Sequence, residues 1–152
     1  MDPGIFKAYD VRGLVPGQLD EPAALAIGRA FAQFLGGGPV AVGRDMRASG
    51  GPLGEALSAG LRAEGADVVD VGRVSTPMLY HATTALGARG GAMITASHNP
   101  GGYNGFKLCG PAAVPIGIES GLAEIRDRAR AVHGQPRPGP RAAQSARDLH
   151  DA

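Results

Sequence analysis

Apolar residues recur three or four positions apart in several stretches of this chain, and this spacing is typical of amphipathic helices. The first stretch follows Asp20, a residue type that caps helix N-termini, and it stops at three consecutive glycines, residues 36–38. A serine followed by Thr-Pro opens a later stretch. The pattern predicts helices over residues 21–35, 53–61, 76–86 and 118–132.

Short continuous apolar runs separate these helices and predict buried strands. They occupy residues 39–43, 66–71 and 91–95, and a further strand-like piece at 107–109 is expected to run antiparallel. Strands that alternate with helices are typical of a layered α/β domain. We therefore expect a mixed, mostly parallel sheet with helices on both faces.

Polar residues follow three of the predicted strands at the points where those strands end. Arg44 and Asp45 follow the first, Ser75 and Thr76 the second, and Ser97 the third. In open α/β sheets, ligands gather outside the carboxyl ends of the parallel strands. We therefore expect these loops to form one wall of a cleft.

The loop after the third strand is the strongest indication of chemistry. Ser97 comes directly after an apolar run, with His98 and Asn99 beside it, and Pro100 followed by two glycines disfavours a helix there. A loop held by a rigid scaffold is where reacting side chains usually lie. A hydrolase nucleophile is the alternative, but the sequence around this serine is not the G-x-S-x-G turn of many hydrolases. We interpret Ser97 as a covalent carrier of phosphate.

Three motifs carry a resemblance to a known family. They are T-A-S-H-N-P with Y-N-G-F-K at residues 95–107, F-K-A-Y-D-V-R-G at 6–13, and G-R-D-M-R at 43–47. Together they resemble the phosphohexomutases over residues 4–133, which corresponds to the first of the four domains of complete members. The N-terminal motif is similar to the phosphomannomutase/phosphoglucomutase branch. Phosphoglucosamine mutase is the alternative, although such enzymes more often carry G-T-D-G at that place.

The resemblance implies an isomerase that moves phosphate reversibly between the 1- and 6-positions of a hexose phosphate. Ser97 would carry the phosphate, and a hexose 1,6-bisphosphate would be the intermediate and activator. The catalytic residues would be Ser97, His98 and Lys107. The substrate-binding residues would be Tyr9, Arg12, Asn99 and Lys107.

The resemblance also implies a Mg²⁺ ion that contacts the phosphate on Ser97. In the family, the metal loop, the sugar-reading loop and the distal phosphate clamp belong to later domains. We therefore expect residues 1–152 alone to be inactive, with the remaining domains of the same enzyme as partners. A non-catalytic α/β module that binds a sugar phosphate or another protein is the competing class.

Several other residues have structural interpretations. Arg44, Asp45 and Arg47 are expected to form an ion-pair network that braces the Ser97 loop, and Asn99 is expected to fold that loop through its side-chain amide. Cys109 is expected to pack in the core. The remaining histidines have no metal-ligand spacing; they are His81, His133 and His150.

Composition changes this picture little. A formal net charge of +1 gives no reason to expect nucleic acid or membrane as a partner. The positive charges are almost all arginine, because Lys7 and Lys107 are the only lysines. A single cysteine cannot form an internal disulfide, and with no apparent leader or membrane span the expected location is cytoplasmic.

The composition shifts after His133. We expect residues 1–133 to form the α/β domain and residues 134–152, rich in Pro and Arg at their start, to be a linker and the beginning of a second domain. A short natural protein with an unstructured tail is the alternative.

Overall fold

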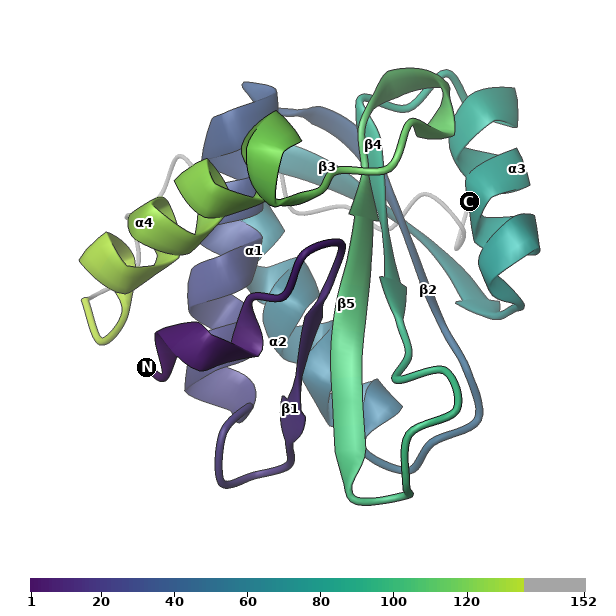
Figure 1. Ribbon diagram of the computed structural model, residues 1–152. Coiled ribbons are helices and arrows are strands. Elements are labelled where there is room, and N and C mark those ends of the chain that lie inside the picture. The colour runs from purple at the N-terminus through teal and green to yellow at the C-terminus, as the bar shows by residue number, and fades with distance from the viewer. Residues whose placement is uncertain (136–152) are drawn as a thin grey trace.

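A mixed sheet of five strands forms the centre of the computed structural model, which describes residues 1–135 (Figure 1). The strand order is β1-β5-β4-β2-β3. Strand β2 is parallel to β3 and to the central strand β4, whereas β5 is antiparallel to β4 and β1. The strands are β1 Val11–Leu14, β2 Gly38–Arg44, β3 Ala66–Arg73, β4 Gly90–Ile94 and β5 Tyr103–Cys109.

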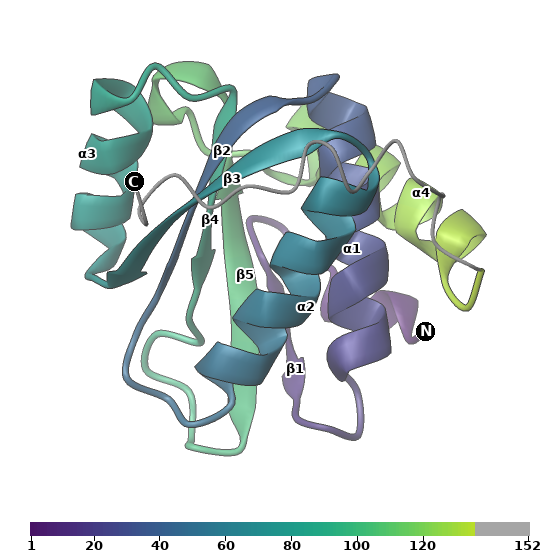
Figure 2. The same ribbon diagram turned by 180° about the vertical axis from the view of Figure 1, so that it is seen from behind.

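Helices cover both faces of this sheet. Helices α1, α2 and α4 lie on one face and α3 lies on the other, as the two opposite views show (Figures 1 and 2). This arrangement confirms the predicted fold class. The helices are α1 Glu21–Leu35, α2 Gly50–Ala63, α3 Thr76–Ala85 and α4 Ala123–Val132, with short turns η1 Pro3–Ile5, η2 Pro111–Ala113 and η3 Ile118–Leu122. No helix among residues 1–135 is both long and apolar enough to cross a membrane.

The signals that predicted the helix ends act locally. The Asp20 carboxylate accepts a hydrogen bond from the Ala23 amide at 2.9 Å, and the Ser75 hydroxyl accepts one from the Met78 amide at 3.2 Å. Gly36 ends α1 in the left-handed conformation, with a φ of 78°. The predicted starts of α1 and α3 and the predicted end of α1 are therefore confirmed.

The C-terminal helix differs from its prediction. A continuous helix was expected from residue 118, but α4 begins at Ala123, after the single π-helical turn η3. Gly121 breaks the helix with a φ of 144°. A Cβ at this glycine would lie 2.4 Å from Cζ of Phe34 in α1, so the chain reorients where it contacts α1. The predicted linker and second-domain start, apart from Gly134 and Gln135, lie outside the described residues.

Two hydrophobic clusters hold the layers together. The larger one joins the sheet to α1, α2 and α4, and includes Phe31, Leu57 and Phe106, all fully buried. The smaller one lies under α3 and is formed by Ala41, Leu79, Met93 and Cys109. The face that α3 covers therefore has the smaller core.

Helices α1 and α2 approach each other through two glycines. A Cβ at Gly28 would lie 2.1 Å from the carbonyl oxygen of Leu57, and one at Gly60 would lie 2.1 Å from that of Leu25. Because these contacts are with backbone atoms, an added methyl group cannot be accommodated by a side-chain rotation. The distance between the two helices thus depends on both glycines.

We predict that Gly28→Ala lowers the free energy of unfolding by about 1–3 kcal/mol, since the added methyl group forces the two helices apart. Gly51→Ala is the matched control, because Gly51 is also helical and has nothing within 4 Å of an added Cβ. It should raise stability by about 0.5–1 kcal/mol through helix propensity. Urea unfolding of the purified variants measures both values. Equal effects of the two substitutions would contradict the proposed helix contact.

Candidate functional site

The loops that follow β2, β3 and β4 lie at one edge of the sheet because these strands are parallel. Backbone hydrogen bonds join them. The Asp45 amide donates to the Ile94 carbonyl at 3.1 Å, and the Val74 amide donates to the Arg44 carbonyl at 3.0 Å. The segments that carry Asp45, Ser75 and Ser97 are therefore neighbours, as the sequence predicted.

Ser97 occupies an uncommon backbone conformation. Its φ is 54°, in the left-handed region that serine rarely adopts, and the residue is exposed. The Asn99 amide donates to the Ala96 carbonyl at 3.0 Å and closes a tight turn around the serine. Backbone conformations of this kind persist only where the surroundings enforce them, and they cluster at functional sites.

Arg47 is the residue that enforces this conformation. Its guanidinium donates to four backbone carbonyls of the loop: Nη1 to those of Pro100 and Tyr103 at 2.8 and 2.9 Å, and Nη2 to those of Ser97 and Asn99 at 3.0 and 2.6 Å. A guanidinium suits this role because its donors point outward in a rigid plane. One side chain therefore fixes the loop from the serine to the start of β5.

Asp45 stabilises the same loop through Thr95 and Arg47. Its carboxylate accepts a hydrogen bond from the Thr95 hydroxyl at 2.7 Å and another from the Arg47 amide at 3.1 Å. The Thr95 oxygen in turn accepts from the Ser97 amide at 3.0 Å. The predicted bracing role of Asp45 and Arg47 is confirmed.

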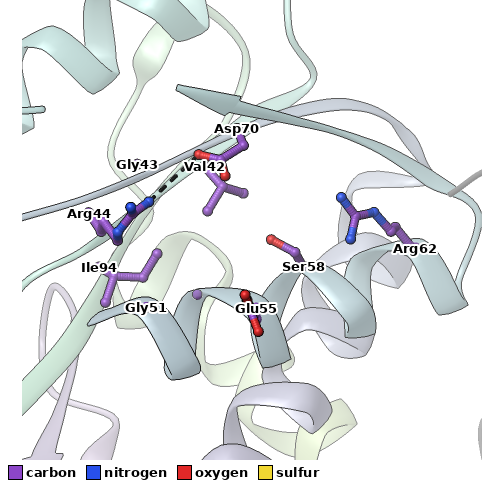
Figure 3. A pocket seen from close by; sticks show the side chains of 10 residues that line it. Val42, Gly43, Arg44, Gly51, Glu55, Ser58, Arg62, Asp70 and Ile94 are labelled. Atoms are coloured by element: carbon purple, nitrogen blue, oxygen red, sulfur yellow. Dashed lines mark ion pairs between the residues drawn. The ribbon is translucent and has the colours of Figure 1, made fainter. Parts of the chain in front are cut away.

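The prediction for Arg44 is wrong. Arg44 lies opposite Ile94 in β4 and projects to the α2 face of the sheet, where its guanidinium is 3.9 Å from the Asp70 carboxylate (Figure 3). It lines a pocket of about 440 Å³ together with Glu55 and Arg62, away from the Ser97 loop. Side chains alternate between faces along a strand, so Arg44 cannot reach the loop that its neighbour Asp45 supports.

Arg12 connects the N-terminal segment to the Ser97 loop. Its Nη1 donates to the Asn99 side-chain oxygen at 2.9 Å, and its Nη2 donates to the Asp10 carboxylate, which is only 8% exposed. Asn99 was predicted to fold its own loop through its side-chain amide. Instead its side-chain oxygen anchors the loop to β1, and the turn is closed by backbone groups.

Gly105 of β5 allows the backbone of β1 to pack closely against β5. It lies opposite Arg12, and a Cβ there would be 2.0 Å from the Val11 carbonyl oxygen. The glycine of the Y-N-G-F-K motif is therefore required by the close approach of the two backbones. Next to it, the fully buried Asn104 donates to the Ser49 hydroxyl at 2.8 Å and ties β5 to the start of α2.

Lys107 projects from the face of the sheet that α3 covers. It lies opposite Met93 of β4, which belongs to the cluster under α3, and residues directly opposite each other share a face. Gly105 is two positions away and opposite Arg12, so Arg12 is on this face as well. Lys107 and Arg12 thus come from adjacent strands of one face.

A cavity of about 610 Å³ lies beside the Ser97 loop, within the usual size range of ligand pockets. All four predicted substrate-binding residues line it, namely Tyr9, Arg12, Asn99 and Lys107. Tyr9 is 80% exposed, which is unusual for a large aromatic side chain. Ser97 and His98 are exposed on the adjoining loop and are not in the lining.

Sequence reasoning did not assign to the site five residues that line this cavity, namely Lys7, Ala8, Asp10, Gln18 and Tyr103. A signal for Lys7 existed, since it is one of two lysines in the chain and lies in the F-K-A-Y-D-V-R-G motif. A signal for Tyr103 existed as well, since it is the first residue of the Y-N-G-F-K motif.

Cys109 packs in the core, as predicted. It is fully buried, and burial raises the pKa of its thiol, an effect that hydrogen bonds with Thr83 and Gly91 partly oppose. The neutral thiol is therefore the stable form at neutral pH, and a reactive thiolate is disfavoured. No group of three or more His, Cys, Asp or Glu side chains within residues 1–135 is placed to hold a metal ion.

Comparison with known proteins agrees with the fold and the motifs. A family model described as phosphoglucomutase/phosphomannomutase, alpha/beta/alpha domain I, matches residues 3–134. A protein named as a phosphohexose mutase from Xanthomonas campestris pv. campestris (strain B100) is 52% identical over 122 residues, which are 80% of this chain and 27% of that protein. A phosphomannomutase from Klebsiella pneumoniae is 46% identical over 121 residues, 80% of this chain and 77% of that protein.

A solved structure gives the same result. The X-ray structure of a phosphoglucomutase/phosphomannomutase family protein from Burkholderia thailandensis is similar with a TM-score of 0.80 and 38% identity, over 99% of this chain and 34% of that chain. This chain spans about a quarter of the length of the Xanthomonas relative and about a third of the Burkholderia protein. The chain therefore belongs to the phosphoglucomutase/phosphomannomutase family, and it contains the α/β/α domain I of that family.

Proposed function

We propose that this chain is the phosphate-carrying domain of a phosphomannomutase or phosphoglucomutase, and that Ser97 is the residue that carries the phosphate. The observation that supports this most is the Ser97 loop itself. An exposed serine with a φ of 54° lies in a loop whose backbone accepts four hydrogen bonds from one arginine, beside a cavity lined by cationic side chains. The names of the phosphomannomutase relatives favour this branch over phosphoglucosamine mutase.

The charge of the cavity suits a phosphorylated ligand. Lys7, Arg12 and Lys107 line it together with one carboxylate, Asp10, which gives the lining a net formal charge of +2. A phosphate monoester carries about −1.5 to −2 charges at neutral pH. The cavity therefore has the sign and amount of charge that such a group needs.

The proposed reaction begins with phosphorylated Ser97. A free hydroxyl oxygen of a hexose 1- or 6-phosphate attacks the phosphorus, and the bond from phosphorus to Ser97 Oγ breaks as the new phosphorus–oxygen bond forms. The sugar hydroxyl loses its proton, and Oγ gains one. The resulting hexose 1,6-bisphosphate turns around, and Ser97 Oγ attacks its other phosphate, which releases the isomeric monophosphate and restores the phosphoserine.

The residues around the loop have distinct proposed roles. His98, adjacent to the serine and exposed, would accept or return the hydroxyl proton. Lys107 and Arg12 would stabilise the charge that spreads over the moving phosphoryl group, where positioning and electrostatics supply most of the catalysis. Tyr9 and Asn99 would contact the sugar.

The described residues do not supply a complete set of ligands for the Mg²⁺ ion that the resemblance implies. Mg²⁺ usually takes one or two carboxylates besides phosphate oxygens. The Asp45 carboxylate is already engaged by Thr95 and Arg47, and no metal-holding cluster is present in residues 1–135. A phosphate on Ser97 could supply an oxygen ligand, but carboxylates would have to come from outside this range. We therefore expect the isolated chain to have no mutase turnover.

We predict that Ser97 is the only residue of the complete enzyme that holds a stable phosphate. Incubation with a hexose 1,6-bisphosphate, followed by intact mass measurement and peptide mapping, should place one phosphate on the peptide that contains Ser97. Ser97→Ala should take up none, because no other hydroxyl occupies the strained turn. Ser75→Ala is a matched control that should be labelled normally, since Ser75 caps α3. Phosphate retained by Ser97→Ala would contradict the proposal.

We predict that Lys107→Ala in the complete enzyme lowers kcat by roughly 10²–10³, as removal of one preorganised electrostatic contact commonly does. Lys107→Arg should recover part of the rate, since a planar guanidinium does not replace a compact ammonium. The free energy of unfolding should change by less than about 0.5 kcal/mol, because the half-buried lysine lies at the cavity rather than in either core cluster. Steady-state kinetics and urea unfolding test this. A loss of rate that matched a loss of folded protein would make Lys107 a structural residue.

A further inference from the structure

Both lysines of this chain line the same cavity. Lys7 and Lys107 are separated by 100 positions in the sequence, yet they share a lining with Arg12. The chain otherwise uses arginine for its positive charges. The two compact ammonium groups are thus found together at one place.

The backbone determines the position of Lys7. Its amide donates to the Asp10 carbonyl at 2.7 Å, and Phe6 and Val11 form an isolated antiparallel bridge around this turn. The turn is followed directly by β1, so Lys7, Tyr9 and Arg12 are presented to the cavity as one unit. Phe6 and Val11 are buried in the larger core, which anchors the turn.

The cationic groups of this cavity are incompletely paired. Within residues 1–135, neither the Lys7 nor the Lys107 ammonium has a hydrogen bond or ion pair. The buried Nε of Arg12 has no hydrogen-bond partner in this range either. By contrast, Arg29 pairs with Glu64 at 2.9 Å, and Arg128 pairs with Glu124 at 2.8 Å. Cationic donors gathered at one concave surface without partners of their own are suited to bind an anionic group.

We propose that Lys7 is a binding residue for the phosphate group of the ligand, and that Lys7, Arg12 and Lys107 together form a phosphate-binding site of three cations. This inference extends the proposed function and rests on its cavity. Asp10 keeps Arg12 in position, and the two lysines act as compact charges from the turn and from β5. Lys7 is exposed whereas Lys107 is half-buried, so Lys7 contributes to affinity more than to stabilisation of the moving phosphoryl group.

The presence of only two lysines makes this proposal directly testable in the 152-residue chain. Reductive methylation with ¹³C-formaldehyde converts each lysine to a dimethylammonium that keeps its charge. The NMR spectrum then contains one methyl signal for each lysine and one for the amino terminus. Lys7→Arg and Lys107→Arg assign the two lysine signals. The probe is inorganic phosphate, added at constant ionic strength with chloride as the reference anion.

We expect both lysine signals to shift along one saturation curve, while the signal of Met1 stays in place. A response of Lys107 alone, or two different dissociation constants, would overturn the role of Lys7 and leave the proposed function intact. If neither lysine signal shifted, the phosphate-binding site as a whole would be overturned, and with it the proposed role of Lys107.

A charge-matched pair of variants completes the test. Lys7→Ala should weaken phosphate binding, read from the Lys107 signal, by about three- to fivefold, as expected for one charge-assisted contact at an exposed site. Arg130→Ala removes the same charge from an exposed position on α4 and should change binding by less than about twofold. Equal effects of the two variants would show that net charge alone matters and would overturn the proposal.

Discussion

The contact between the Arg47 guanidinium and the backbone of the Ser97 loop is the interaction on which the candidate site depends. The loop contains two glycines and a serine in a left-handed conformation, so its own sequence does not favour one ordered structure. Hydrogen bonds to the carbonyls of Ser97, Asn99, Pro100 and Tyr103 replace the regular backbone pairing that the loop lacks. The serine is thereby exposed and held in place at once.

The uneven cover of the sheet explains why a charged cavity can exist beside this loop. One face is closed by three helices, whereas α3 alone covers the other face and packs on Ala41, Met93 and Cys109. The same face continues onto β5 and β1, where Lys107 and Arg12 replace apolar side chains. Cys109 and Lys107 are two residues apart on the same face of β5, yet the Cys109 thiol is buried under α3 and the Lys107 side chain lines the cationic cavity.

Features encoded by neighbouring residues could be predicted from the sequence. The helix caps at Asp20 and Ser75, the runs of the three parallel strands and the exposed Ser97 loop are all of this kind. Features that depend on distant contacts could not. The break at Gly121 depends on Phe34, and the four carbonyl contacts of Arg47 join positions about fifty residues apart. The prediction for Arg44 was wrong because the side chains of adjacent residues at a strand end can point to opposite faces of the sheet.

The most direct test of this account is the rate at which a hexose 1,6-bisphosphate phosphorylates Ser97 in Arg47→Lys compared with the unchanged enzyme. Lysine keeps the charge but loses the planar fork that holds four carbonyls. The account predicts a rate lower by roughly 10- to 100-fold in a protein that remains folded, because a serine misplaced by about 1 Å is poorly aligned for transfer. An unchanged rate would contradict the claim that this clamp positions the serine.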